Sequence, residues 1–293
     1  MTPPDLPQRV LALDTSTDRL SVAVGHPGAA PLAEHSGPGG AQASASLIPV
    51  IQDLLARVGW RLDQLDAIAY GCGPGSFTGL RTACAVVQGL AVAGRPGGIP
   101  VLPVPTLLAV AQAARADAPP LRPGQRVLAV LDARMDELYV AEAVWSAAEH
   151  RVTPPPYRPG APGGGATEAA PPTVGLRLCG PAWLSRPEDL ATPAGWPQAA
   201  VHPDAVPPAW WAGNAHAVYS ARLPAAWQAV PRVDTWPTAA ALLALVPGLW
   251  AAGAAVDAAQ AQPLYVRDKV AHTTEERERL KAAQVQARTG DAA

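Results

Sequence analysis

The stretch of residues 70–81, with the sequence YGCGPGSFTGLR, constrains the fold of this chain more than any other. Four glycines and one proline lie within nine of its residues. It follows an apolar run and precedes a run rich in small residues at 82–93. This order predicts a strand over 66–70, a glycine turn, and a helix that the hydroxyl of Ser76 or Thr78 caps.

The glycine turn has two interpretations that the sequence leaves open. A strand, a glycine turn and a helix N-terminus together aim free backbone N–H groups at one point, and the helix dipole favours an anion there. The same residues are equally typical of a tight turn that only reverses the chain. Arg81, one turn into the helix, is suited to a phosphate or to a partner's carboxylate, and is as often a solvated surface residue.

A strand–Asp–turn–strand pattern occurs twice in the chain. Residues 9–14 form an apolar run that leads into the tripeptide DTS at 14–16, and a second strand follows at 20–25. The same order recurs at 127–145 around the polar turn 132–137, which indicates a duplicated β-hairpin, one in each of two domains. Asp, Thr and Ser at such a tip either hold phosphate, metal or water, or bond their own backbone. The residues predicted to contact a nucleotide or another anion are Asp14, Thr15, Ser16, Gly73, Gly75, Ser76, Thr78 and Arg81.

Two predicted helices carry apolar stripes. Over residues 46–58 apolar side chains fall at helical spacing, with Ser46 as the expected N-cap, Pro49 in the first turn and Gly59 at the end. The helix at 77–93 has two stripes, one of Leu80, Cys84, Val87 and Ala91 and one of Gly79, Ala83, Val86, Gly89 and Ala93. Two apolar stripes predict a helix that is buried on both sides. The covering side chains come either from its own domain or from a partner. Because small side chains permit close helix approach, a subunit interface is one hypothesis for this helix.

Composition excludes several classes of protein. The formal net charge is −2 and the pI about 6.3. The chain therefore lacks the excess of positive charge that is typical of a protein that binds nucleic acid by itself. We expect no membrane-spanning run of roughly 20 apolar residues and no signal peptide. Three unpatterned cysteines predict free thiols in a reducing compartment, and therefore a cytoplasmic location.

Self-sufficient catalysis has little support in the sequence. The six histidines are scattered and no Cys-x-x-Cys occurs, so we expect no protein-built metal site. The glycine turn lacks the Lys of a Walker loop, and no Gly-x-Ser-x-Gly elbow follows an apolar strand. A further hypothesis is that the carboxylates of Asp14, Asp132 and Asp136 converge between the two domains. Their spacing in the sequence does not decide this. We therefore predict no catalytic residues and no metal ligands.

At these residues the chain resembles the TsaB (YeaZ) family, the non-catalytic paralogue and partner of the TsaD subunit in tRNA threonylcarbamoyladenosine biosynthesis. The matching segments are LALDTST at 11–17, GPGSFTGLR at 73–81, QGLA at 88–91, DARMDELY at 132–139, Gly213-Asn214 with Tyr219, and PLYVR at 263–267. The resemblance implies an α/β protein with the actin/Hsp70-like ATPase (ASKHA) fold, in which two related lobes each have a mixed sheet flanked by helices. It implies a first lobe of 1–104 plus about 236–270, a second lobe of 105–235, and a charged tail at 271–293.

The resemblance also implies a function. Family members bind and activate the TsaD transferase, which modifies adenosine 37 in tRNAs that read codons starting with A, and the TsaE ATPase joins the pair. The resemblance implies that the chain contacts tRNA only through the complex and that it has no cofactor of its own. Whether ATP or ADP binds at the junction between the two subunits stays open. The two subunits pair through the helices of the first lobe, here Ser44–Val58 and Phe77–Ala93, and we expect the isolated chain to form a homodimer through the same surface. The expected interface residues are Ser44, Leu47, Ile51, Leu55, Thr82, Val86, Gly89, Leu90 and Ala93.

Two departures from the family pattern stand out. The family usually has His-Ser ahead of its first long helix, whereas here Ala43 precedes Ser44. The segment 153–173 is rich in Pro and Gly and is typical of an insertion. The alternatives are a peptidase, as the family's older glycoprotease-like label suggests, and a stand-alone ATPase, which would need phosphate loops in both lobes.

Overall fold

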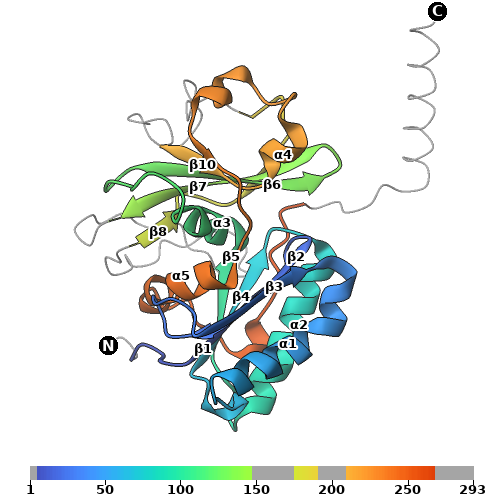
Figure 1. Ribbon diagram of the computed structural model, residues 1–293, viewed down its shortest axis with the longest axis vertical. Helices are drawn as coiled ribbons and strands as arrows, with labels where there is room; N and C mark the ends of the chain where they lie inside the picture. Colours follow the sequence, from blue (N-terminus) through green and yellow to red (C-terminus); the bar gives the residue numbers. More distant parts are fainter. Residues whose placement is uncertain (1–4, 147–174, 191–208, 268–293) are drawn as a thin grey trace, which may run out of the picture.

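Each of the two predicted hairpins starts the β-sheet of its own lobe. The structure, a computed structural model, describes residues 5–146, 175–190 and 209–267. Within these ranges the two lobes lie one above the other (Figure 1). The expected fold of two related α/β lobes is confirmed. The predicted insertion at 153–173 and the predicted tail at 271–293 lie outside the described residues.

The first sheet has five strands in the order β3-β2-β1-β4-β5. The strands are β1 (Val10–Asp14), β2 (Arg19–Gly25), β3 (Ala33–Pro38), β4 (Ala67–Gly73) and β5 (Val101–Pro105). β1 pairs antiparallel with β2, where Leu11 lies opposite Val24, and parallel with β4, where Leu11 lies opposite Ile68. The helix between β3 and β4 provides the crossover that this parallel pairing needs.

The second sheet repeats this topology. Its order is β11-β10-β6-β7-β8, so β6, β7, β8, β10 and β11 take the places of β1, β2, β3, β4 and β5, and β9 pairs with β7. The strands are β6 (Arg126–Arg134), β7 (Glu137–Ser146), β8 (Gly175–Leu178), β9 (Trp183–Ser185), β10 (Trp210–Ala212) and β11 (Arg232–Val233). The duplication predicted from the two hairpins therefore extends to the strand order of both sheets.

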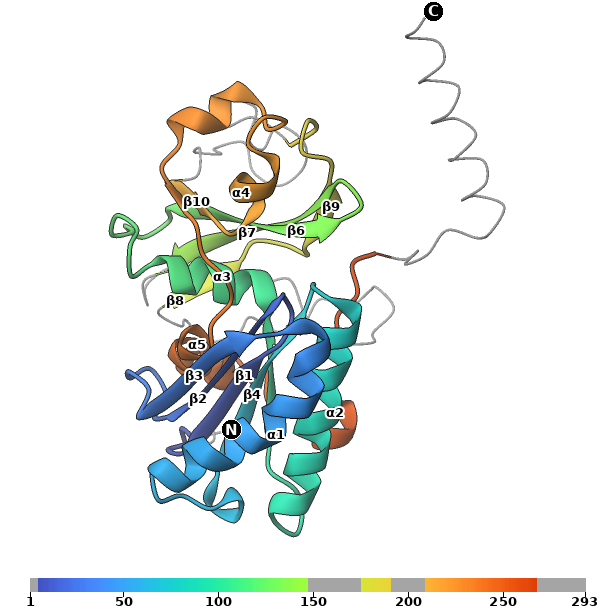
Figure 2. The same cartoon turned by 45° about the vertical axis from the view of Figure 1, so that its right-hand side comes forward.

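The helices complete a layered arrangement (Figures 1 and 2). They are α1 (Ala43–Arg57), α2 (Phe77–Gly94), α3 (Thr106–Ala114), α4 (Ala215–Tyr219) and α5 (Ala239–Ala251). Short 3-10 turns lie at Gly40–Gln42, Leu62–Gln64, Ala225–Ala229 and Ala258–Gln260. α1 and α2 cover the outer face of the first sheet, α3 and α5 lie between the two sheets, and α4 covers the far face of the second.

Alternation along β1 shows how this layering arises from the sequence. Leu11 and Leu13 pack into the core beneath α1 and α2, whereas Val10 and Ala12 pack into the core formed with α3 and α5. Successive side chains of a strand point to opposite faces, so a sheet covered on both sides needs an unbroken apolar strand. α5 follows β11 in the chain yet packs on the first sheet, so the two lobes share one central helical layer.

Two predicted boundaries are wrong. α1 begins at Ala43, so Ser46 lies inside the helix, where its hydroxyl donates to the carbonyl of Gln42, and Pro49 lies beyond the first turn. β4 continues past residue 70 to Gly73, because its last residues still pair with β5. Of the two candidate caps for α2, Ser76 is the N-cap, and its side chain accepts from the N–H of Gly79.

Candidate functional site

The glycine turn packs directly against the tip of the first hairpin. The N–H of Ser76 donates to the carbonyl of Ser16 at 2.6 Å, and the hydroxyl of Thr15 donates to the carbonyl of Gly79 at 2.7 Å. A Cβ at Gly79 would lie 1.9 Å from the Thr15 carbonyl oxygen, and one at Gly75 would lie 2.3 Å from that of Ser16. Two backbones therefore approach so closely that only glycine fits, which accounts for the glycines without a phosphate.

Asp14 is enclosed by the same contact and is 1% exposed. Its Oδ1 accepts from the N–H and the hydroxyl of Ser16, at 2.9 and 2.7 Å. Its Oδ2 has no hydrogen-bond partner and lies where a Cβ at Gly71 would be, 1.8 Å away. Burial raises the pKa of Asp14 to about 6, and the hydrogen bonds from Ser16 offset part of that effect. This carboxylate faces the interior and offers no surface to a ligand.

The outer residues of the predicted anion site lie at the N-terminal end of α2. Ser76, Thr78 and Arg81 are exposed there. The guanidinium of Arg81 lies 3.8 Å from the ring centroid of Phe77, and its Nε donates to the hydroxyl of Tyr265 at 3.1 Å. Buried Gly73, by contrast, donates its N–H to a side chain of α3, the hydroxyl of Thr106. The eight predicted residues are thus brought together in space, but only Ser76, Thr78 and Arg81 are exposed. Gly75 is half-buried, and the other four are buried.

The second lobe has an equivalent turn, and its own side chains fill it. A Cβ at Gly213 would lie 1.9 Å from the carbonyl oxygen of Val130, and Asn214 Oδ1 accepts from the N–H of Asp132. The hydroxyl of Tyr219 donates to Asp132 Oδ1 at 2.9 Å. Burial, and then this hydrogen bond to a carboxylate, raise the pKa of Tyr219 to about 12.

The expected convergence of three carboxylates is not found. Asp132 is bonded within its own lobe, and Asp136 pairs with Arg222 at 2.6 Å. Across residues 5–146, 175–190 and 209–267, no group of three or more His, Cys, Asp or Glu side chains is placed to hold a metal ion. None of the three cysteines forms a disulfide, in agreement with the prediction.

α2 presents an apolar face to solvent as well as one to the core. Its buried residues are Gly79, Leu80, Ala83, Cys84, Val87, Ala91 and Gly94. On the other side Ala85, Gly89 and Ala93 are exposed, and Val92 is 70% exposed. By length and composition alone, α2 is the one described helix that could cross a membrane, and its buried side instead packs on β4 within the first lobe. Of the predicted interface residues on this helix, Gly89 and Ala93 are exposed and Thr82, Val86 and Leu90 are half-buried.

On α1 most of the predicted interface residues lie in the core, although two of them, Ile51 and Leu55, also line a surface groove. Ser44 is exposed, but Leu47, Ile51 and Leu55 are buried in the core of the first lobe, because the apolar stripe of this helix packs on β2. Ile48, which is not among the predicted interface residues, is 44% exposed. The sequence offered no signal for this exposure, since Ile48 belongs to the same predicted apolar stripe as Leu47. A shallow, mainly apolar groove of about 260 Å³ lies between the two helices, lined by Ile48, Ile51, Gln52, Leu55, Ala56, Trp60, Leu62 and Leu90.

The departure at Ala43 also falls in the core. This residue begins α1 and is fully buried. At the position where the family pattern usually has a histidine, the chain therefore contributes a methyl group to internal packing.

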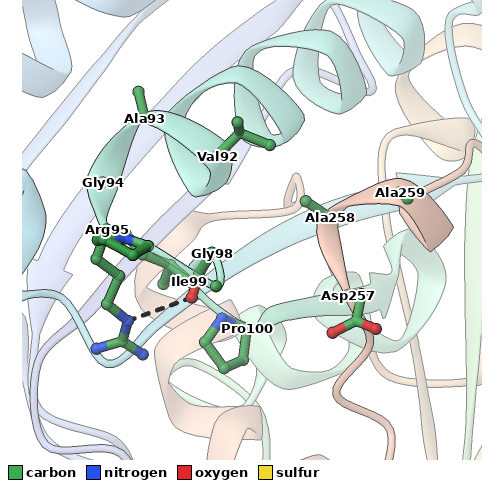
Figure 3. Close-up of a pocket in the computed structure, with 12 residues that line it drawn as sticks. Val92, Ala93, Gly94, Arg95, Gly98, Ile99, Pro100, Asp257, Ala258 and Ala259 are labelled. Atoms are coloured by element: carbon green, nitrogen blue, oxygen red, sulfur yellow. Dashed lines mark hydrogen bonds between the residues drawn. The ribbon is translucent and has the colours of Figure 1, made fainter.

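A larger depression, of about 760 Å³, lies at the C-terminal end of α2 (Figure 3). Arg95 and Asp257 lie on opposite sides of it, and the Nε of Arg95 donates to the carbonyl of Gly98 at 3.2 Å. The rest of the lining is backbone and small or apolar side chains. Its polar side chains do not converge on one point, which a specific small-molecule site requires.

Comparison with known proteins gives one consistent family. Residues 36–151 match the family model described as TsaD: tRNA N6-adenosine threonylcarbamoyltransferase. The tRNA threonylcarbamoyladenosine biosynthesis protein TsaB of Haemophilus influenzae is 40% identical over 139 residues, which are 46% of this chain and 53% of that protein. TsaB of Escherichia coli is 39% identical over 134 residues, 46% of this chain and 54% of that protein. The chain thus spans about half the length of the curated relatives it matches.

Solved structures extend the likeness over nearly the whole chain. YeaZ from Pseudomonas aeruginosa has a TM-score of 0.63 and 35% identity, and the match covers 88% of this chain and 99% of that one. A second structure, described as an uncharacterized protein with similarity to peptidase YEAZ from Pseudomonas aeruginosa, has a TM-score of 0.62 and 34% identity, covering 89% of this chain and 100% of that one.

Proposed function

The chain belongs to the TsaB (YeaZ) family, and on that premise we propose that it acts in tRNA threonylcarbamoyladenosine biosynthesis as a non-catalytic subunit. It binds and activates a TsaD-type transferase that modifies adenosine 37, and the TsaE ATPase joins the pair. It meets tRNA only through this complex, forms a homodimer when isolated, and works in the cytoplasm.

The observation that carries this proposal is the outward face of α2. Exposed apolar residues on a helix whose other side is already buried indicate a surface that is covered in an assembly. Gly89 has no atom within 4 Å of where its Cβ would be, so a partner helix can approach its backbone closely. Val92 and Ile48 flank this surface as exposed large side chains and would supply apolar area at its rim.

The geometry of the two turns favours an accessory role over a stand-alone ATPase. In the first lobe the hairpin tip fills the space beneath the glycine turn. In the second lobe the carboxylate of Asp132, which corresponds to Asp14, already accepts a hydrogen bond from the hydroxyl of Tyr219. A nucleotide at the subunit junction would be left with Ser76, Thr78 and Arg81, which are exposed at the start of α2. A peptidase would need an accessible nucleophile beside a base, whereas the hydrogen-bonded pair Ser16 and Asp14 is buried.

Co-expression with the cell's own TsaD homologue tests the proposal. We expect the two chains to co-purify and to restore threonylcarbamoyladenosine in tRNA, and Gly89→Arg to abolish both. Because nothing surrounds the Cβ position of Gly89, the variant keeps its fold, and circular dichroism checks this. Val218→Arg, at an exposed apolar residue of α4, is the matched control and leaves pairing intact.

Each part of the proposal fails on a different result. Pairing that survives Gly89→Arg shows that the interface lies elsewhere. Modification that proceeds equally well without this chain removes the accessory role, and modification by this chain alone makes it an enzyme. Tight ATP binding by the isolated chain, measured by isothermal titration, supports the stand-alone ATPase instead.

A further inference from the structure

The last described segment of the chain, residues 261–267, is bound to the first lobe by several hydrogen bonds. The N–H of Leu264 donates to the carbonyl of Cys72 at 2.6 Å, and the hydroxyl of Tyr70 donates to that of Gln262 at 3.0 Å. The carbonyl of Ala261 accepts from Cys84 Sγ and Gln88 Nε2, both at 2.9 Å. These contacts tie the segment to the end of β4 and to the side of α2. In Figures 1 and 2 it runs up beside α2 towards the second lobe.

Arg267 makes the contact with the second lobe. Its Nη2 donates to the carboxylate of Glu137 and, at 3.3 Å, to the carbonyl of Arg134, while Nη1 lies 3.1 Å from the sulfur of Met135. The Arg267 side chain is only 13% exposed. The guanidinium of Arg267 thus contacts Arg134, Met135 and Glu137 in the turn between β6 and β7. The segment that carries Arg267 is bound to the first lobe.

The turn that Arg267 holds is unfavourable by itself. Arg134, Met135 and Asp136 have φ angles of 62°, 55° and 60°, a left-handed conformation that side chains other than glycine disfavour. Such a run persists only where surrounding contacts hold it. Those contacts come from Asp132, which accepts from the N–H of Arg134 at 2.8 Å, from Arg222, which pairs with Asp136, and from Arg267. Arg267 alone of the three reaches the turn from the segment on the first lobe.

We infer that residues 261–267 form a strap that locks the two lobes together, and that Arg267 is the residue that closes it. The strap also carries Tyr265, whose hydroxyl accepts from Arg81 and whose ring lies 5.2 Å from that of Phe77. The N-terminal end of α2 is therefore coupled to the second lobe through one continuous segment. This inference does not depend on the proposed function.

Hydrogen exchange on the full chain tests the strap. In Arg267→Gln we expect the amide of Leu264 and the amides of 134–137 to exchange about tenfold faster or more, since local opening of both ends now precedes global unfolding. Circular dichroism is expected to be unchanged. Arg57→Gln is the control, because Arg57 and Asp53 form an exposed ion pair within α1 whose loss leaves both regions protected.

Glu137→Gln breaks the same contact from the second lobe and leaves the strap sequence intact, so it provides the test if Arg267→Gln fails to fold. We expect it to release Leu264 although Glu137 lies in the other lobe, and the double variant to add little to either change, since both remove one interaction. Unchanged protection at Leu264 in both single variants overturns the inference. In that case the shared layer of α3 and α5 holds the lobes by itself.

Discussion

Replacing Asp14 by Asn isolates the cost of burying this carboxylate. Burial raises the pKa of Asp14 from 3.8 to about 6 in the folded protein. The folded state therefore binds more protons than the unfolded state between these two values, and its stability falls as the pH rises through that window. The difference between the two pKa values makes this loss of stability about 2 kcal/mol from this one group between roughly pH 4 and pH 7.5.

Asn keeps the oxygen that accepts from Ser16 and removes the charge. Its amide N–H groups would take the place of Oδ2, which has no hydrogen-bond partner, at a cost of about 1–3 kcal/mol that does not change with pH. The test is therefore the pH dependence of the difference between Asp14→Asn and wild type, measured by urea unfolding across that range. We expect this difference to move in favour of the variant as the pH rises.

Asp63→Asn is the control of opposite sign. The hydrogen bond from Arg61 lowers the pKa of this exposed carboxyl group, so its contribution to stability is present above its unfolded pKa and is lost as the pH falls. A difference between Asp14→Asn and wild type that stays constant with pH would refute the reasoning, because it would mean that the Asp14 carboxylate is solvated in the folded protein.

Two matched pairs of variants test the geometry of the first lobe by thermal unfolding. Gly79→Ala places a Cβ 1.9 Å from the Thr15 carbonyl oxygen and should destabilise the fold severely, whereas Gly89→Ala meets no atom and should stabilise α2 by about 0.5–1 kcal/mol. Leu47→Ala removes a fully buried side chain and should cost about 2–5 kcal/mol, whereas Ile48→Ala should change stability by under about 0.5 kcal/mol and weaken only the pairing with a partner. Equal effects within either pair would contradict the assigned burial.

Sequence patterns located most of the first lobe's elements because local signals there agree with the fold. Alternation and the DTS tip marked the hairpin, and Ser76 was a candidate cap by its chemistry. The start of α1 was missed because no side chain caps it: Gln42 precedes the helix without a side-chain hydrogen bond. The end of β4 was missed because glycines in a strand resemble a turn, and only pairing with β5 shows that Gly71 is extended.

For the candidate site, spacing separated apolar from polar positions but not one apolar face from another. Leu47 and Ile48 are neighbours of similar hydrophobicity, and only the packing of α1 on β2 decides that the first is core and the second surface. The glycine turn shows the same limit, because close backbone approach and phosphate binding both require glycine.

By itself the sequence determined the family, the two-lobe α/β fold and the duplicated hairpins, because motifs and strand periodicity are local properties of the chain. Only the tertiary structure decided that the hairpin tip fills the glycine turn, that α2 keeps an uncovered apolar face, and that Arg267 reaches the turn at Arg134. Those contacts join residues up to 133 positions apart, and which of two chemically equivalent faces is buried depends on what the rest of the chain brings against it.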